Sequence, residues 1–302
     1  MRSLTLEAAV ALAFAAALPA QVSKTLDLTT APATKTHYVV FASRGRSATG
    51  HSFVIWGVED GGQKRSTIQA LGLYPEKDAP SCSSLTGKVP GLLLDELATH
   101  SVEAVDQELI VRVDEADFAR ALRVARQWNC RHEFSLLSHD CVEFLRAVGE
   151  ALQLPMPKRN VVRWTPQAYV RALLASVREG TLDLGDTVYE GFLMDDQPMG
   201  KGSLRGQDGG EIDGSFRGLD HHSGAGEFPV CRGSFEYEGG VVDFRAQGKG
   251  VLRGPNGLSI RGVFEQGKLM RKQPRPLADC GPIAAQWMAI PAIGQNARPA
   301  PD

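Results

Sequence analysis

The first part of the chain alternates short runs of β-branched and aromatic residues with polar turns, which is the pattern of β-strands. Such runs predict strands at 37–41, 51–58, 66–74 and 108–113. The turn Glu59-Asp60-Gly61-Gly62 separates the two middle runs and is typical of a hairpin, because Asp-Gly and Gly-Gly tolerate positive φ. The preceding stretch, residues 21–36, is rich in Thr, Ala and Ser and predicts an extended lead-in.

Apolar residues then recur at helical spacing and predict three helices. One follows Asp114, one runs from 141 to about 152, and one runs from Thr165-Pro166 to about Val177 with a stop near Gly180. Asp140 and Glu143 have the spacing of a capping box, which places Cys141 in the first turn of the second helix. Strands followed by helices indicate an α+β fold.

Glycine becomes dense after Thr181, and the segment repeats. Gly200-Lys201-Gly202, Gly224-Ala225-Gly226 and Gly248-Lys249-Gly250 follow one another at intervals of 24 residues (224 − 200 and 248 − 224). A fixed period of this size means stacked supersecondary units, and each unit is too short for a pair of helices. Residues 187–270 are therefore predicted to form an elongated all-β, single-layer sheet of hairpins. Its aromatic ladder would comprise Phe192, Phe216, Phe235 and Phe264.

Composition indicates the number of domains, the class of partner and the cellular compartment. The 302 residues suffice for two domains, and a formal net charge of −2 without a basic stripe argues against nucleic acid as a partner. Residues 1–20 combine Arg2 with an apolar run and a small-residue ending, so we expect a signal peptide and an exported, periplasmic or secreted protein. The six prolines of residues 271–302 predict a Pro-rich tail.

Cys141 carries the clearest chemical signal. A thiol in the first turn of a helix faces free N–H groups and the positive end of the helix dipole, and both favour the nucleophilic thiolate. His51, 90 residues upstream (141 − 51) at the head of a predicted strand, is the candidate base. His139 is a rival base, and Arg44 is a candidate ligand for a substrate carboxylate. The alternative for Cys141 is a buried core thiol.

Two family resemblances follow from these motifs. Gly50-His51-Ser52-Phe53-Val54 early in the chain, with Cys141 opening a late helix after Ser138-His139-Asp140, resembles the circularly permuted branch of the NlpC-type papain-like amidases and peptidases. This resemblance covers roughly residues 35–177, within a domain predicted at 37–180. The Tyr-x-Gly-x-Phe and Gly-x-Gly-x-Leu pattern of residues 187–270 resembles MORN repeats.

The papain-like resemblance implies a Cys141 thiolate, a His51 base and a third polar residue that orients the imidazole. In the family this third residue lies on the strand that follows the His strand. We expect Gln69 in this role, because a hairpin centred near Gly61 would pair it around Phe53, next to His51.

Taken together, the sequence predicts a permuted papain-like antiparallel sheet with helices, followed by a hairpin-repeat domain. The expected activity is that of an exported cysteine hydrolase that needs no metal or organic cofactor. Its substrate would be an amide or peptide in the cell envelope, with peptidoglycan peptides leading, and the repeats would bind a membrane surface or a protein. The alternatives are a lipid acyltransferase or thioesterase of the same fold, and an inactive scaffold that acts as a binding protein.

Overall fold

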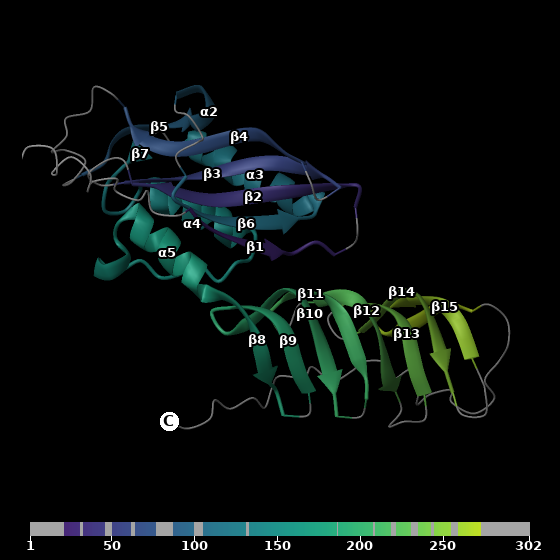
Figure 1. Ribbon diagram of the computed structural model, residues 1–302. Coiled ribbons are helices and arrows are strands. Elements are labelled where there is room, and N and C mark those ends of the chain that lie inside the picture. Colours follow the sequence, from purple (N-terminus) through teal and green to yellow (C-terminus); the bar gives the residue numbers. More distant parts are fainter. Residues whose placement is uncertain are drawn as a thin grey trace, which may run out of the picture.

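The computed structural model describes residues 21–30, 33–45, 50–61, 64–76, 87–99, 105–130, 133–185, 187–207, 209–218, 222–230, 235–242, 245–254 and 259–272. Within these ranges the protein is mixed α+β and contains two open sheets (Figure 1). The predicted signal peptide at 1–20 and residues 273–302 of the predicted tail lie outside the described residues. So do Cys82, Cys231 and Cys280.

The first sheet has the strand order β1-β6-β2-β3-β4-β5-β7. Its strands are β1 (Val22–Asp27), β2 (Lys35–Arg44), β3 (His51–Asp60), β4 (Lys64–Pro75), β5 (Val89–Asp95), β6 (Gln107–Val113) and β7 (Glu133–Phe134). The pair β1–β6 is parallel and the other described pairs are antiparallel. The four predicted strands are present, but the lead-in contributes an edge strand to the sheet, and β5 and β7 were not predicted.

Helices pack against this sheet. They are α2 (Glu96–Thr99), α3 (Glu115–Asn129), α4 (Cys141–Ala151), the 3-10 turn η2 (Val161–Arg163) and α5 (Pro166–Ser176). The α4 helix packs on β3 and β4, α5 on β2, β3 and β6, and α3 on β2 and β5. No helix among the described residues is both long and apolar enough to cross a membrane.

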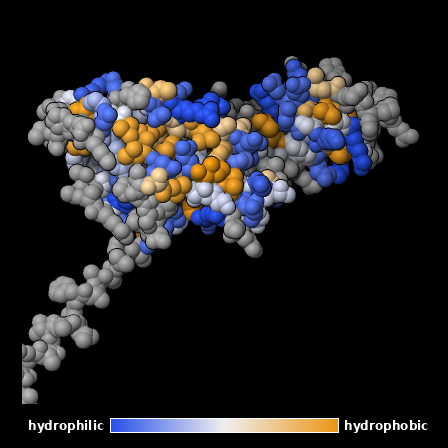
Figure 2. Space-filling view, turned by 90° about the horizontal axis from the view of Figure 1, so that it is seen from above, coloured by the Kyte–Doolittle hydropathy of each residue, from blue (hydrophilic) through white to orange (hydrophobic). Residues whose placement is uncertain are grey.

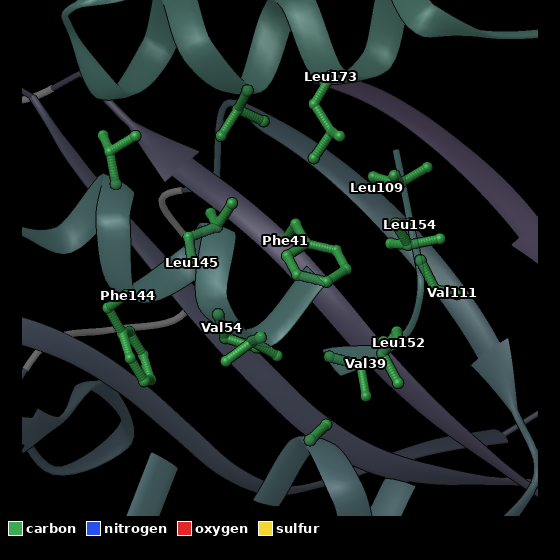
Figure 3. Packing of buried hydrophobic residues seen from close by; sticks show 14 of the residues in the cluster. Val39, Phe41, Val54, Leu109, Val111, Phe144, Leu145, Leu152, Leu154 and Leu173 are labelled. Atoms are coloured by element: carbon green, nitrogen blue, oxygen red, sulfur yellow. The ribbon is translucent and has the colours of Figure 1, made fainter. Parts of the chain in front are cut away.

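Apolar side chains on one face of the strands pack against the apolar faces of the helices and form a core. Phe41 of β2 and Val54 of β3 face Leu145 of α4 and Leu173 of α5, and none of the four is exposed to solvent (Figure 3). Burying an apolar side chain of this size contributes about 1.5–3 kcal/mol. The core therefore fixes α4, and with it Cys141, against the strand that carries His51.

The second sheet is a nine-stranded antiparallel meander in which each strand pairs with its neighbours in sequence. Its strands are β8 (Val177–Asp183), β9 (Thr187–Met194), β10 (Gln197–Gly206), β11 (Glu211–Arg217), β12 (His222–Val230), β13 (Phe235–Val242), β14 (Arg245–Arg253), β15 (Ser259–Glu265) and β16 (Lys268–Lys272). Helix is absent from the described residues of this segment, in agreement with the predicted hairpins.

The recurring glycines make room for tyrosine rings. A Cβ on Gly202 would lie 2.4 Å from the Tyr189 hydroxyl oxygen, and a Cβ on Gly250 would lie 2.3 Å from that of Tyr237. A real Cβ does not approach that closely, so each ring rests on backbone that only glycine provides. The two arrangements are separated by 48 residues (237 − 189 and 250 − 202), which is two of the 24-residue intervals.

The predicted phenylalanine ladder is wrong at Phe192, whereas Phe216 and Phe264 do make ring contacts, each with a tyrosine. The ring contacts pair Tyr189 with Phe216 at 4.9 Å and Tyr237 with Phe264 at 5.0 Å between centroids, both edge-on. Phe192 instead packs against the core of the first sheet, and the side chain of Phe235 lies outside the described residues. Edge-on aromatic pairs are favourable because the positive ring edge meets the negative face.

The residues around Gly180 form a strand, where the sequence predicted the stop of a helix. The α5 helix ends at Ser176 and β8 begins at Val177, so the chain passes from one sheet to the other without a linker (Figure 1). Gly180 lies within β8 and pairs with Gly191 of β9. The α5 helix ends next to the predicted Val177, and β8 occupies the residues from Val177 to Gly180.

Candidate active site

Cys141 is the first residue of α4 and is 7% exposed. Asp140 is the N-cap, as the sequence predicts, and its Oδ1 accepts hydrogen bonds from the N–H groups of Val142 and Glu143, each at 3.1 Å. These bonds satisfy two of the donors that a helix start leaves free. The capped turn therefore holds Cys141 in a fixed position at the positive end of the helix.

His51 lies next to this thiol. It is the first residue of β3 and is buried, and its ring forms hydrogen bonds with Cys141 and with Glu96. The bond to Glu96 joins Nε2 to Oε1 at 3.1 Å, so Nδ1 is the ring nitrogen left for the thiol. A thiol, an imidazole and a carboxylate in this order are the parts of an activated nucleophile, its base and an orienting group.

A buried network surrounds the carboxylate. The Glu96 side chain is 1% exposed, accepts a hydrogen bond of 2.6 Å from Arg44 Nη2 at Oε2, and accepts one of 2.8 Å from the Tyr74 hydroxyl at Oε1. The ring of Tyr74 stacks on that of His51 with 4.2 Å between centroids. A Cβ on Gly72 would lie 2.3 Å from both His51 Nε2 and Glu96 Oε1. The missing side chain at residue 72 thus permits the contact between His51 and Glu96.

The electrostatics of the network favour a charged imidazole. Burial alone would lower the pKa of His51, but its hydrogen bonds to Cys141 and Glu96 and their charges outweigh burial and raise the pKa to about 9. Burial would raise the pKa of Glu96, yet hydrogen bonds from His51 and Tyr74 and the Arg44 charge hold it below its ordinary value. At neutral pH the pair is therefore an imidazolium beside a carboxylate.

We expect the stability conferred by His51 to fall as pH rises. Its pKa is about 9 in the folded protein against 6.5 for the free side chain, so the contribution is complete below pH 6.5 and is lost as pH passes through 9. A shift of this size corresponds to about 3 kcal/mol. Urea unfolding of wild type and His51→Gln at about pH 5.5, 7 and 9.5 measures it. The difference in unfolding free energy should shrink toward high pH; a difference that stays constant or grows would contradict the expectation.

The structure brings Cys141 and His51 together but places Gln69 elsewhere. A β-bulge lies between Trp56 and Gly57, and Gln69 pairs with Trp56 rather than around Phe53. Two causes add up to this shift of three residues: Asp60 pairs with Lys64, so the hairpin is centred one residue beyond Gly61, and the bulge adds one more residue. Gln69 is thereby moved along β4, away from the end of the sheet where His51 lies.

Two other candidates have structural roles instead. His139 stacks on Trp128 at 4.6 Å between centroids, and its Nδ1 contacts the Ser138 carbonyl oxygen. Arg44 binds Glu96 and Tyr74 with a side chain that is 11% exposed. A guanidinium engaged in this way supports the orienting carboxylate rather than a substrate carboxylate.

Glu96 was missed because the strand before it was missed. The run Leu92-Leu93-Leu94 ends in Asp95-Glu96, and an apolar run closed by acids was a usable signal for a strand with a carboxylate at its end. Nothing in the sequence marks the side of the sheet on which Glu96 lies. Its position depends on β5 pairing with β4, in which Gly72 faces Leu94.

Comparison with known proteins adds no family to this geometry. No family model matches the chain, and no curated protein matches it. Among the described residues no group of three or more His, Cys, Asp or Glu could hold a metal ion. Cys130, which is exposed, and Cys141 are both free thiols. The chemistry of the site follows from its own side chains.

Proposed function

We propose that the protein is a cysteine hydrolase in which Cys141 is the nucleophile, His51 the base and Glu96 the group that orients the imidazole. The observation that carries the proposal is the position of His51 between a helix-opening thiol and a carboxylate buried by Arg44 and Tyr74. The order of a His strand before a Cys helix supports the permuted papain-like resemblance, and the hairpin meander supports the resemblance to MORN repeats.

The proposed reaction is acyl transfer through a thioester. The Cys141 thiolate attacks the substrate carbonyl carbon, and the carbonyl oxygen takes up the negative charge. His51 as imidazolium then gives its proton to the leaving amine, so the C–N bond breaks and the acyl group stays on sulfur. The neutral imidazole next removes a proton from water, which attacks the thioester, and the thiolate leaves.

The oxyanion would be stabilised from the helix start. Because Asp140 engages the N–H groups of Val142 and Glu143, the N–H of Cys141 is the donor of this turn that remains for the developing charge. Removing one donor of this kind costs about 100- to 1,000-fold in turnover in a hydrolase. The cap thus leaves one backbone donor of this turn, the Cys141 N–H, for the oxyanion.

An inactive scaffold is a weaker proposal than an enzyme. A carboxylate that is 1% exposed and an imidazole that is 9% exposed are costly to bury, and such perturbed pairs concentrate in functional sites. For the substrate we propose an amide of the cell envelope, with peptidoglycan peptides leading. A lipid ester or acyl chain is the alternative, because it would use the same thioester chemistry.

The repeat sheet is proposed to bind the larger target, either a protein or a membrane surface. Its distal strands expose Val263 and Met270 among the basic residues Lys249, Arg253 and Arg261. Seen from above, this end of the molecule mixes hydrophilic and hydrophobic surface (Figure 2). Repeat sheets of this kind commonly present extended binding faces.

Selective alkylation of Cys141 tests the proposal. A thiolate–imidazolium pair reacts with iodoacetamide at about pH 6, where an ordinary thiol with a pKa of about 8.5 is almost wholly protonated. We expect the Cys141 peptide to be labelled at pH 6, with the exposed Cys130 peptide as the internal standard, by mass spectrometry. His51→Gln should slow this labelling at least about tenfold, and Glu96→Gln should slow it less.

The matched control is Gln69→Ala, which removes the residue that the sequence analysis favoured and should leave the labelling rate unchanged. Equal labelling of Cys141 and Cys130 at pH 6, or no effect of His51→Gln in a folded protein, would overturn the assignment. Incubation with isolated peptidoglycan and with phospholipid vesicles, followed by product analysis, then separates amide hydrolysis from lipid acyl transfer.

A further inference from the structure

Arg159 binds several groups around the start of α4, the helix that Cys141 opens, and these contacts are called the clamp below. Its Nη1 lies 3.0 Å from Asp140 Oδ1 and its Nη2 lies 2.6 Å from Oδ2, a bidentate ion pair. The same Nη2 donates to the carbonyl oxygens of Leu136 at 3.4 Å and Trp164 at 3.3 Å. One guanidinium therefore ties the loop before Cys141 to its N-cap and to the segment that leads into α5.

The clamp is shielded from water. The side chains of Arg159 and Asp140 are 11% and 6% exposed. In such surroundings a bidentate pair is strong and directional, because the planar guanidinium matches the two carboxylate oxygens. The other charged group close by is Glu143, whose carboxylate lies 3.8 Å from Arg159 and also binds Arg146.

Arg159 opposes the effect of burial on Asp140. Burial raises the pKa of Asp140, and the Arg159 hydrogen bond and charge oppose that rise. Without the guanidinium the carboxyl would be driven further toward its neutral form, in which it is a poorer acceptor for the N–H groups of Val142 and Glu143. The first turn of α4 would then lose its cap, and the thiol its fixed position beside His51.

We propose that Arg159 is a positioning residue for the Cys141 nucleophile, acting through the Asp140 cap and the Leu136 carbonyl. This inference rests on the proposed function. Arg159 does not touch the reacting atoms; it sets where the thiol and the Cys141 N–H point. Displacing a reacting group by about 1 Å can cost about a hundredfold in rate.

The experiment measures the rate of Cys141 alkylation by iodoacetamide as a function of pH in Arg159→Lys. Lysine keeps the charge but cannot make the bidentate contact, so the protein should fold while Cys141 labelling at pH 6 falls at least about tenfold. The matched control is Arg146→Met on the same helix, which removes a half-buried ion pair to Glu143 and a more exposed one to Glu150 and should leave the rate unchanged.

A second variant guards against misfolding. Arg159→Met combined with Asp140→Asn leaves no unpaired buried charge and retains an amide oxygen as a cap acceptor. This protein should melt cooperatively and still label slowly at pH 6, because it lacks the contacts of Arg159 to the carbonyl oxygens of Leu136 and Trp164. Wild-type rate and pH profile in both folded variants would overturn the inference. If wild-type Cys141 itself shows no selective labelling, the proposed function fails instead, so the two failures are distinguishable.

Discussion

Cys141→Ser is expected to abolish hydrolysis of envelope peptides while leaving the fold intact. The substitution changes one buried atom, from sulfur to oxygen, in a turn that Asp140 already caps. A serine hydroxyl stays protonated at neutral pH beside an imidazole that is itself protonated, so it is a far poorer nucleophile than the thiolate. Loss of a nucleophile of this kind costs at least about a thousandfold in turnover.

The measurement is release of soluble peptides from isolated peptidoglycan by wild type, Cys141→Ser and Cys130→Ser. Cys130 is an exposed free thiol at the end of α3, so its replacement controls for the general loss of a cysteine. Cys130→Ser should match wild type. Full turnover by a cooperatively melting Cys141→Ser protein would place the chemistry on another residue.

The sequence located Cys141 and His51, which the structure brings together, because both residues are marked locally. A cap residue before an amphipathic helix identified the turn that carries Cys141, and a Gly-His pair before a β-branched run identified His51. The position of Glu96 beside His51 could not be predicted in this way. It depends on the pairing of β4 with β5, which joins residues that are distant in the sequence.

Register explains the error at Gln69. Side chains alternate across a strand, so a single bulge changes which residues face one another. Neither the bulge between Trp56 and Gly57 nor the hairpin centre one residue beyond Gly61 is visible as a period in the sequence. Tyr74, which stacks on His51, also lies on β4, but its position opposite the ring depends on the true register.

The repeat segment was predictable in kind because its glycines recur in phase. Its relation to the first sheet was not predictable. The sequence signals of a helix stop and a glycine-rich start suggested two separable modules, whereas Val177 already belongs to a strand. A junction without a linker carries no compositional mark, because both sides are ordinary secondary structure.

Side chains of the repeat sheet also pack into the core of the first sheet at this junction. Met194 of β9 and Met199 of β10 are 0% and 2% exposed and belong to the core of the first sheet. Arg217 of β11 donates to the Leu152 carbonyl oxygen at 3.0 Å, at the C-terminal end of α4, and forms an ion pair with Asp117 of α3. The first hairpins of the repeat sheet are thus part of the support of the nucleophile helix.

A chain ending after Gly180 is therefore expected not to fold. Loss of the two buried methionines removes about 3–6 kcal/mol of apolar burial, at about 1.5–3 kcal/mol each. Loss of Arg217 also removes one of the two arginine partners of Asp117, which keeps Arg120, and removes the donor to the Leu152 carbonyl oxygen. The loss of methionine burial alone is comparable with the whole stability of a marginal domain, about 5–15 kcal/mol.

A chain ending after Gly218 is the matched control. It retains β8 to β11, both methionines, Arg217 and the Tyr189–Phe216 pair. We expect it to melt cooperatively and to keep selective Cys141 labelling, since every contact between the first sheet and the repeats named above is preserved. Thermal unfolding followed by near-UV circular dichroism compares the two chains. Cooperative melting and normal Cys141 labelling of the Gly180 chain would show that the repeats are dispensable for the nucleophile helix, because the loss of Met194, Met199 and Arg217 would then have been tolerated.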